Sequence, residues 1–278
     1  MQTLTLNDGN TIPLLGLGTY AATGDDGRAT VKMALEKGYR LIDTAAYYQN
    51  EEAVGQAINA SGVPRSEIFV TTKLWRDQLS YGQAKEAFEA SRQRLGLDYI
   101  DLYLIHWPAN AKNYDDWQAA NAETWRAFEK LQSEGKVRSI GVSNFWPEHL
   151  ESLAQTAKVT PAVNQIEFHP GYWQPDLTAY CKQKGIVVES WSPLAQGRIL
   201  DNPDLQKIAD RHQKSIAQIC LRWVTQHEVV VIPKSSNPER LDLNKDIFGF
   251  TLSGAEMDAI NSLPQIGFSG ELPNEWPD

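Results

Sequence analysis

The amino-acid sequence predicts a (β/α)8 barrel with an N-terminal β-hairpin, folded as a single domain over residues 1–278. Eight short apolar runs recur along the chain, helical patterns separate them, and 278 residues is a usual length for a barrel with one core. The competing architecture is a doubly wound open sheet. It is less well supported, because the segment GLGT is not followed by the rest of the glycine fingerprint of a dinucleotide-binding sheet.

The composition is that of a globular protein, with 42% hydrophobic and 22% charged residues. No apolar run approaches the roughly 18 residues that cross a bilayer, and the first residues lack the features of a secretory signal. We therefore expect a cytoplasmic protein without a membrane partner. A formal net charge of -9 opposes non-specific nucleic-acid binding, so any anionic ligand must be held by a local cluster of donors. We expect a small molecule as the partner, no nucleic acid, and a monomer.

The first predicted element is the hairpin. Leu4 and Leu6 belong to an alternating strand pattern, residues 7–9 read Asn-Asp-Gly, which is a turn signal, and the strand pattern resumes at Thr11. We expect this hairpin to cover one end of the barrel.

Eight predicted strands follow, each short and rich in Val, Ile, Leu or Tyr, as strands buried on both faces are. They span residues 14–19, 39–45, 67–73, 99–106, 137–143, 162–168, 186–192 and 229–234. Helical patterns lie between them, for example at residues 26–38, 84–96, 123–135, 147–157 and 175–185. Asn50 is expected to cap a helix that begins at Glu51. Two segments exceed this plan: residues 107–120, predicted as a long loop on the active face, and the tail after Leu263, expected to fold over the barrel mouth.

Ionisable side chains end three successive predicted strands: Asp43, Lys73 and His106. Tyr48 follows five residues after Asp43, and catalytic residues of barrels come from the carboxyl ends of several strands. Taken singly, His106 fits a satisfied buried histidine and Lys73 a solvated lysine at the rim. Together the four residues suit proton transfer. The charge of Lys73 is expected to lower the pKa of Tyr48, Asp43 to hold Lys73 charged, and His106 to donate to a carbonyl oxygen.

Seven segments occur in the order and approximate spacing of one enzyme family: DTAxxYxNE, TTKLW, LIHWP, GVSNF, NQIEFHP, SWSPLAQG and IPKS. On these segments, which run through nearly the whole chain, the sequence resembles the aldo-keto reductases. It is most similar to the bacterial 2,5-diketogluconate reductase and prostaglandin F synthase-like members. The resemblance implies reversible, NADPH-dependent reduction of aldehydes and ketones, so the expected partner is a small-molecule carbonyl compound. It also implies a catalytic tetrad of Asp43, Tyr48, Lys73 and His106, with Tyr48 as the proton donor.

The same resemblance implies an NADPH site across the strand ends. Ser143, Asn144 and Gln165 are expected to bind the nicotinamide carboxamide, and Trp191 to stack on the nicotinamide where many members have tyrosine. The other residues implied to bind the cofactor are Thr19 and Tyr20 after the first strand, Ser192, Leu194, Gln196 and Gly197 beside the pyrophosphate, and Lys234, Ser235, Ser236, Asn237, Arg240 and Asn244 at the adenosine end.

The residues at the adenosine end also indicate an anion site without the family resemblance. A helix is predicted to begin near Pro238, and a helix N-terminus favours a bound anion. An ordinary N-cap explains the same residues equally well. The resemblance assigns Lys234, Ser235 and Arg240 to the 2′-phosphate of NADPH. Leu243 departs from the family, because several relatives have a polar or acidic residue there, near the adenine amine.

Ring-bearing side chains are predicted to form the substrate pocket: Tyr20, Tyr47, Trp75, His106 and Trp107, with Phe268 or Trp276 as additions from the tail. Such walls accept many carbonyl compounds, so they do not identify the physiological substrate.

Two other functions remain open: a binding or regulatory protein on the same fold, and a metal-dependent lyase or hydrolase. The complete tetrad favours the reductase, whereas loss of activity on chelation would favour the metal enzyme. Glu167 and His169 resemble metal ligands, but no second His or carboxylate pair stands nearby at helical spacing, so we expect structural roles and no metal. Cys181 and Cys220 lie in helical patterns, which favours burial over a disulfide framework.

Overall fold

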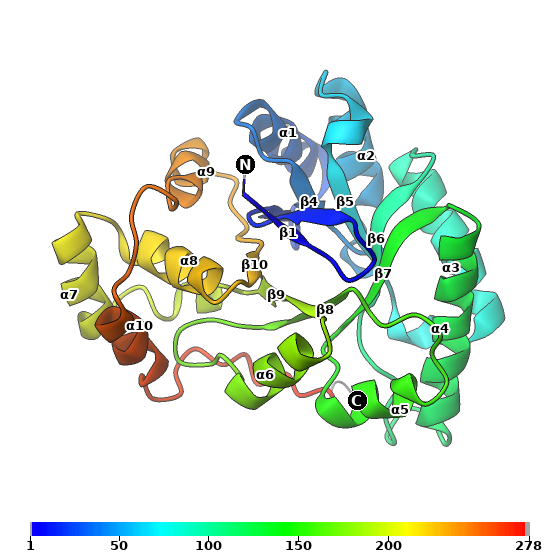
Figure 1. Ribbon diagram of the computed structural model, residues 1–278. Helices are drawn as coiled ribbons and strands as arrows, with labels where there is room; N and C mark the ends of the chain where they lie inside the picture. Colours follow the sequence, from blue (N-terminus) through cyan, green and yellow to red (C-terminus); the bar gives the residue numbers. More distant parts are fainter. Residues whose placement is uncertain (1, 276–278) are drawn as a thin grey trace.

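The computed structural model of the chain describes residues 2–275 and contains a closed parallel barrel of eight strands (Figure 1). The strands lie in sequence order from β3 to β10. The barrel closes between the first and the last of them, where Leu15 bridges Val231 and the Gly16 amide donates to the Val231 carbonyl at 2.8 Å. The predicted fold class is confirmed.

Every barrel strand overlaps one of the predicted apolar runs, because inward side chains fill the barrel while outward ones pack under helices. The strands are β1 (Thr3–Thr5) and β2 (Thr11–Pro13) of the hairpin, and β3 (Leu17–Gly18), β4 (Leu41–Asp43), β5 (Phe69–Leu74), β6 (Ile100–Ile105), β7 (Val137–Ser143), β8 (Val163–Glu167), β9 (Val187–Trp191) and β10 (Val230–Val231) of the barrel.

The N-terminal hairpin closes the amino end of the barrel. Its turn places Gly9 in the left-handed region (φ 86°), where a residue without Cβ is not strained. Ile12 of β2 packs in one cluster with residues that begin barrel strands, among them Leu41, Phe69 and Val163. The prediction that the hairpin covers one end is confirmed, and the opposite end is the one where barrel enzymes place their sites.

The helices pack around the outside of the barrel (Figure 1). They are α1 (Gly24–Glu36), α2 (Glu51–Ala60), α3 (Tyr81–Leu95), α4 (Trp117–Ser133), α5 (Pro147–Ala154), α6 (Pro175–Gln183), α7 (Pro203–His212), α8 (Ile216–Gln226), α9 (Pro238–Lys245) and α10 (Gly254–Asn261). Aromatic contacts join the two layers: the ring of Tyr103 on β6 lies 5.0 Å from Phe88 of α3 and 4.5 Å from Phe128 of α4, centroid to centroid. Cys181 and Cys220 are buried and unpaired, as predicted.

The loop predicted at residues 107–120 is shorter than expected. Helix α4 already begins at Trp117, because Asp116 caps it by accepting a hydrogen bond from the Ala119 amide at 2.9 Å. This cap was not recognised in the sequence.

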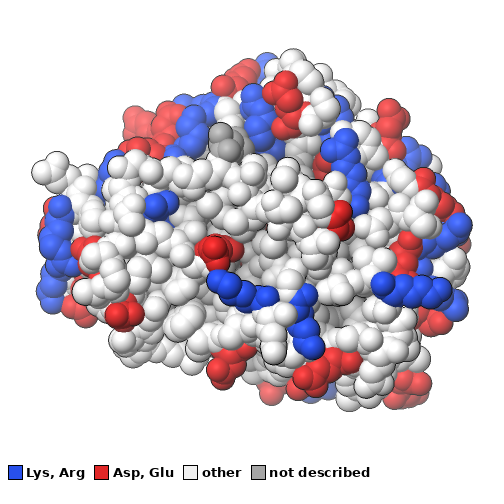
Figure 2. Space-filling model, in the orientation of Figure 1, with Lys and Arg blue, Asp and Glu red and all other residues white. Residues whose placement is uncertain are grey.

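None of the helices in residues 2–275 is both long and apolar enough to cross a membrane. Figure 2 shows acidic and basic side chains interspersed around the edge of one face of the molecule.

Close packing of α2 on α3 gives a testable expectation for Gly55. A Cβ on Gly55 would lie 2.0 Å from the backbone carbonyl oxygen of Leu95, whereas a Cβ on Gly82 would meet nothing within 4 Å. Gly55→Ala should therefore lower the free energy of unfolding by about 1–3 kcal/mol, because two helices must separate. Gly82→Ala, the control, should be neutral or stabilise by about 0.4–1 kcal/mol. Urea titrations measure both, and equal midpoints for the two variants would contradict this packing.

Candidate active site

Asp43, Lys73 and Tyr48 form a hydrogen-bonded chain at the carboxyl end of the barrel. Asp43 ends β4, and the Lys73 ammonium on β5 contacts Asp43 Oδ1 at 2.6 Å. The same ammonium donates to the Thr44 carbonyl at 3.1 Å and to the Tyr48 hydroxyl at 3.2 Å. The cation therefore lies between a carboxylate and a phenol, which is the arrangement expected from the sequence.

The loop between β4 and α2 holds Tyr48 in place. Tyr48 ends the one-turn helix η1 (Ala46–Tyr48), and Asn50 stands at the N-cap position of α2. The side chain of Asn50 does not cap the helix, so that prediction is wrong. It accepts a hydrogen bond from Thr44 Oγ1 at 2.6 Å and donates to the Thr19 carbonyl at 2.8 Å. The buried amide joins two loops instead, because the unpaired carbonyls it satisfies would otherwise be costly.

The Lys73–Asp43 pair is almost inaccessible to water, with side chains 0% and 2% exposed. Burial alone would lower the pKa of Lys73, but the Asp43 carboxylate outweighs that effect and the pKa is raised to about 12. Burial likewise raises the pKa of Asp43, against the opposing charge of Lys73 and the hydrogen bonds from Lys73 and Gln165. A contact of 2.6 Å between nitrogen and oxygen is that of an ammonium with a carboxylate.

The pKa of Tyr48 moves against the prediction. Burial raises it above its ordinary value of 10.0, and the opposing charge of Lys73 does not cancel that effect. The prediction weighed the cation but not the loss of water around the phenol. The outcome suits a proton donor, because the phenol stays protonated at neutral pH while Lys73 remains close enough to stabilise the phenolate left after donation.

His106 contributes a neutral imidazole. It follows β6 directly, and its ring centroid lies 5.6 Å from that of Tyr48 and 5.1 Å from that of Trp75. Burial, and then the charge of Lys73, lower the pKa of His106 well below 6.5. Its Nδ1 has no hydrogen-bond partner within the described part of the chain. A neutral ring carries one N–H, which suits donation to a carbonyl oxygen.

Aromatic side chains form an accessible wall beside Tyr48. Tyr20 is 60% exposed and packs edge-on against Tyr48, with ring centroids 5.2 Å apart. Tyr47 is 46% exposed and stacks on Trp75 at 3.8 Å. The structure brings these residues, predicted to line the substrate pocket, to one side of Tyr48. Their contact with a substrate stays a prediction.

The other residues predicted for this pocket differ in accessibility. Trp107 is only 4% exposed, so little of its ring faces a ligand. Phe268 of the tail packs against Tyr172, with ring centroids 4.4 Å apart. Trp276 lies outside the described residues.

Residues predicted to contact the nicotinamide form one network across the ends of β6 to β9. Asn144 follows β7 with a positive φ of 62°, donates to the His106 carbonyl at 3.0 Å and accepts from the Trp191 indole at 2.8 Å. Ser143 donates to the Gln165 carbonyl at 2.8 Å and accepts from Asn144 at 3.1 Å. The indole of Trp191 is thus held in place while part of its surface stays exposed.

The segment after β9 bends sharply. It contains Ser192, Leu194, Gln196 and Gly197, the residues predicted beside the pyrophosphate. Ser192 and Gln196 have positive φ values of 49° and 55°, and Gln196 and Gly197 are exposed. Backbone held in this region by residues other than glycine is uncommon and is found preferentially at ligand sites.

The residues predicted at the adenosine end surround the start of α9. Lys234 and Arg240 are exposed, whereas Ser235 is buried. The Ser235 hydroxyl donates a long hydrogen bond of 3.5 Å to the Asn237 carbonyl. The Asn237 side chain caps α9 by accepting from the Arg240 amide at 3.0 Å. Two further predicted members are Ser236, exposed beside Asn237, and Asn244, buried on α9.

The remaining rim residues singled out in the sequence are Thr19 and Leu243. Thr19 is buried and donates to the Asp43 carbonyl at 2.9 Å, so it supports the tetrad directly. Leu243, the departure from the family pattern, is 47% exposed on α9.

One member of the buried network, Glu189 of β9, was missed in the sequence. The Gln165 amide nitrogen donates to Glu189 Oε2 at 2.8 Å and to Asp43 Oδ2 at 2.9 Å. Burial, and then the charge of Asp43, raise the pKa of Glu189 to about 8. The available signal was its place two residues before Trp191, because alternate strand residues share a face.

The tail packs over the loops at the carboxyl end of the barrel, as expected. Asn110 donates to the Pro273 carbonyl at 2.9 Å, and Ser269 donates to Glu167 from its amide at 3.0 Å and from its hydroxyl at 2.7 Å. Glu167 also contacts His169 Nε2 at 3.1 Å. Within residues 2–275, no group of three or more His, Cys, Asp or Glu is placed to hold a metal ion. Glu167 anchors the tail through Ser269, and His169 contacts the same carboxylate.

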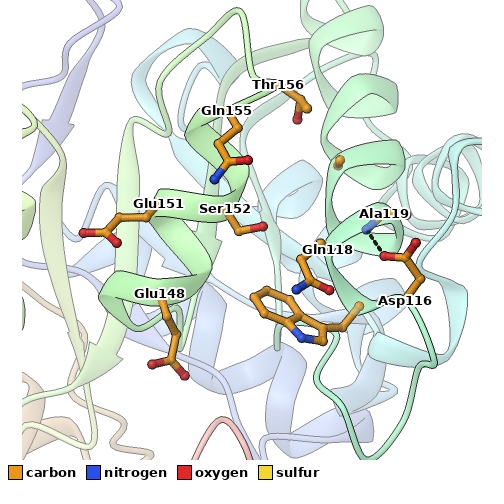
Figure 3. Close-up of a pocket in the computed structure, with 10 residues that line it drawn as sticks. Asp116, Gln118, Ala119, Glu148, Glu151, Ser152, Gln155 and Thr156 are labelled. Atoms are coloured by element: carbon orange, nitrogen blue, oxygen red, sulfur yellow. Dashed lines mark hydrogen bonds between the residues drawn. The ribbon is translucent and has the colours of Figure 1, made fainter.

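A separate groove of about 570 Å³ lies between α4 and α5 (Figure 3). Glu148 and Glu151 of α5 and Asp116 at the start of α4 line it. Asp116 is already engaged as the cap of α4. No member of the tetrad lines this groove, so we assign it no part in the chemistry.

A barrel whose rim carries a phenol beside a buried Lys–Asp pair has the groups that proton transfer requires. The model of the aldo/keto reductase family matches residues 14–265. A glyoxal reductase of Bacillus subtilis (strain 168) is 49% identical over 275 residues, covering 99% of this chain and 97% of the relative. MGS-M4, an aldo-keto reductase from a Medee basin deep-sea metagenome library, has a TM-score of 0.93 and 45% identity, covering 99% of each chain. A Bombyx mori aldo-keto reductase solved in complex with NADP has a TM-score of 0.85 and 41% identity, covering 94% of this chain and 92% of that one.

The chain belongs to the aldo/keto reductase family, so it is an oxidoreductase of carbonyl compounds and alcohols. The resemblance to 2,5-diketogluconate reductase and prostaglandin F synthase-like members stays a prediction.

The tail anchor gives a testable expectation. Ser269→Ala removes a hydroxyl that donates to the buried Glu167 carboxylate, and should lower the free energy of unfolding by about 1–3 kcal/mol. Ser262→Ala is the matched control, because that hydroxyl donates to the Asp258 carbonyl on an exposed helix end; it should change stability by less than about 0.5 kcal/mol. Chemical denaturation compares them. A Ser269 variant as stable as the control would show that the tail is not held at this point.

Proposed function

We propose that this chain reduces small aldehydes and ketones to alcohols, reversibly, with NADPH as the hydride donor and Tyr48 as the proton donor. The observation that carries the proposal is the 3.2 Å contact between the Tyr48 hydroxyl and the Lys73 ammonium. The same ammonium donates to the Asp43 carboxylate at 2.6 Å. A phenol in water releases its proton too reluctantly at neutral pH. The buried ammonium stabilises the phenolate as it forms, at the point where the developing charge needs it.

The substrate carbonyl is proposed to lie between Tyr48 and His106. The neutral imidazole donates a hydrogen bond to the carbonyl oxygen and polarises it, while Tyr48 supplies the proton. Tyr20 and the stacked pair of Tyr47 and Trp75 stand beside this position. In alcohol oxidation the same groups act in reverse, with the Tyr48 phenolate taking the proton.

The residues present fit NADPH, which supplies the hydride when bound. At one end, the Trp191 indole is fixed by Asn144 with part of its ring exposed, as an aromatic platform for a flat heterocycle requires. At the other end, the exposed Lys234 and Arg240 flank the N-terminus of α9, where backbone N–H groups and the helix dipole favour a phosphate. This cationic donor set suits the 2′-phosphate, which distinguishes NADPH from NADH.

For the substrate we infer small, electrophilic carbonyl compounds. The Bacillus subtilis relative is named a glyoxal reductase, and the aromatic wall beside Tyr48 is open to solvent at Tyr20 and Tyr47. A panel of aldehydes, α-ketoesters and keto sugars, followed through NADPH absorbance, would rank the substrates. The expectation of a cytoplasmic monomer stays a prediction, and light scattering on the purified protein would measure its oligomeric state.

The assignment of the proton donor rests on which of two adjacent tyrosines meets Lys73. Tyr48→Phe removes the hydroxyl at nearly constant volume, so kcat for reduction should fall by about 10²–10⁴ while NADPH still binds. Tyr47→Phe is the control: its ring stacks on Trp75, and kcat should change by less than about tenfold. Rapid-mixing kinetics and fluorescence titration with NADPH measure the two effects. Undiminished turnover in the Tyr48 variant, or an equal loss in the Tyr47 variant, would overturn the assignment.

The cofactor preference is tested at Arg240. Arg240→Ala should weaken NADPH binding by about 1–3 kcal/mol, the scale of one charge-assisted hydrogen bond, and leave NADH affinity almost unchanged. Arg126→Ala is a control, because Arg126 is an exposed arginine paired with Glu123 on α4. Isothermal titration with both cofactors gives the comparison. If NADPH and NADH lost affinity equally, Arg240 would not bind the 2′-phosphate.

A further inference from the structure

Glu189 is a buried carboxyl group directly behind the tetrad. Its side chain is 0% exposed, and its strand neighbours are Gln165 on β8 and Val230 on β10, neither of which carries a charge. The charged groups that face it are Asp43 from β4 and Lys73 from β5. Burying a carboxyl group costs free energy unless the group is neutral or hydrogen-bonded, so a purely structural role would be unfavourable here.

Four hydrogen bonds connect Glu189 to the Tyr48 hydroxyl through three intervening residues, Gln165, Asp43 and Lys73. Gln165 Nε2 donates to Glu189 Oε2 at 2.8 Å and to Asp43 Oδ2 at 2.9 Å, so one amide group bridges two carboxyl groups. Asp43 Oδ1 accepts from Lys73, and Lys73 donates to Tyr48. Glu189 Oε1 is buried and has no partner in the described part of the chain. Among the described residues, the bond from Gln165 to Glu189 Oε2 is therefore the one hydrogen bond that connects Glu189 to the network.

The charge balance of this cluster depends on Glu189. With Glu189 protonated, the cluster holds one cation, Lys73, and one anion, Asp43. Burial and the Asp43 charge raise the pKa of Glu189 to about 8, so the neutral form prevails at neutral pH. Loss of its proton would add a second negative charge behind Lys73. That charge would oppose formation of the Tyr48 phenolate, because the ammonium would then be shared between two carboxylates.

Resting on the function proposed above, we propose that Glu189 is a positioning residue: through the Gln165 amide it fixes Asp43 and hence Lys73, and its charge state sets how readily Tyr48 releases its proton. Reduction is then fastest while Glu189 is neutral. It slows as Glu189 ionises, before Tyr48 itself titrates.

The kinetic test is the pH dependence of kcat for carbonyl reduction at saturating NADPH. In the unmodified protein kcat should fall by about tenfold between about pH 7 and pH 9. Glu189→Gln keeps an oxygen acceptor for Gln165 but cannot ionise, so the fall should move upward by about one pH unit or more. Glu167→Gln is the matched control, because Glu167 is equally buried on neighbouring β8 but contacts Ser269 and His169. It should keep the profile of the unmodified protein.

A second test needs neither cofactor nor substrate. The ionisation of Tyr48 is isolated as the difference in tyrosinate absorbance between a protein and its Tyr48→Phe counterpart. In the Glu189→Gln background this ionisation should occur at a pH lower by about one unit or more. If no carbonyl compound were reduced at all, the proposed function would fail while this titration still decided the role of Glu189.

Thermal unfolding separates positioning from a purely structural role. The raised pKa of folded Glu189 means that its stability contribution is present below its ordinary value of 4.5 and is lost as pH rises towards 8. Glu189→Gln should therefore fold, and should gain melting temperature relative to the unmodified protein as pH rises through that window. A change in melting temperature with an unaltered kinetic profile and an unaltered Tyr48 titration would overturn the proposal, and so would a shift of the profile in the Glu167 control.

Discussion

A lysine and an aspartate with almost no access to water meet 2.6 Å apart at the inner edge of the barrel, and the site depends on that pair. Removing two charges from water is unfavourable, and the attraction between them compensates only when their remaining hydrogen-bonding capacity is filled. Here the Thr44 carbonyl and the Tyr48 hydroxyl accept from Lys73, and Gln165 donates to Asp43. The requirement to satisfy this pair explains why polar groups converge at one level of an otherwise apolar barrel.

The two ends of the barrel serve different purposes. At the amino end the hairpin covers the interior with aliphatic side chains such as Ile12, which pack on residues that begin barrel strands. At the carboxyl end, the interior groups are those of the tetrad and its supporting amides. Strand β3 is short and passes close to the chain after β10: a Cβ on Gly18 would lie 2.8 Å from the Ile232 carbonyl, so closure of the barrel relies on glycine there. Stability and reactivity are thus separated along one axis.

Much of the fold could be predicted from the sequence, because strands buried on both faces leave uninterrupted apolar runs and each run ends where the chain returns to the rim. The tetrad was predictable for the same reason, since Asp43, Lys73 and His106 close three such runs. Glu189 was missed, because its place two residues before Trp191 was a weak signal and an acidic side chain within a strand is not expected to face the barrel interior. The direction of the Tyr48 pKa shift follows from burial, and residues far away in the sequence, Tyr20 and His106, pack against the Tyr48 ring. The cap predicted at Asn50 was wrong because the side-chain oxygen of Asn50 accepts from Thr44 in the same loop, while its nitrogen donates to Thr19 of another loop.

The protonation state of Lys73 decides whether its amine can react with a carbonyl compound. An amine beside a reactive carbonyl compound forms an imine when it is unprotonated, and that reaction would trap the substrate on the protein. Asp43 raises the pKa of Lys73 to about 12, so the nitrogen keeps its lone pair occupied at neutral pH. The thiol of Cys181 is also unreactive at neutral pH, because burial raises its pKa to about 11 and little thiolate forms. The ion pair with Asp43 therefore keeps the Lys73 nitrogen from acting as a nucleophile at neutral pH.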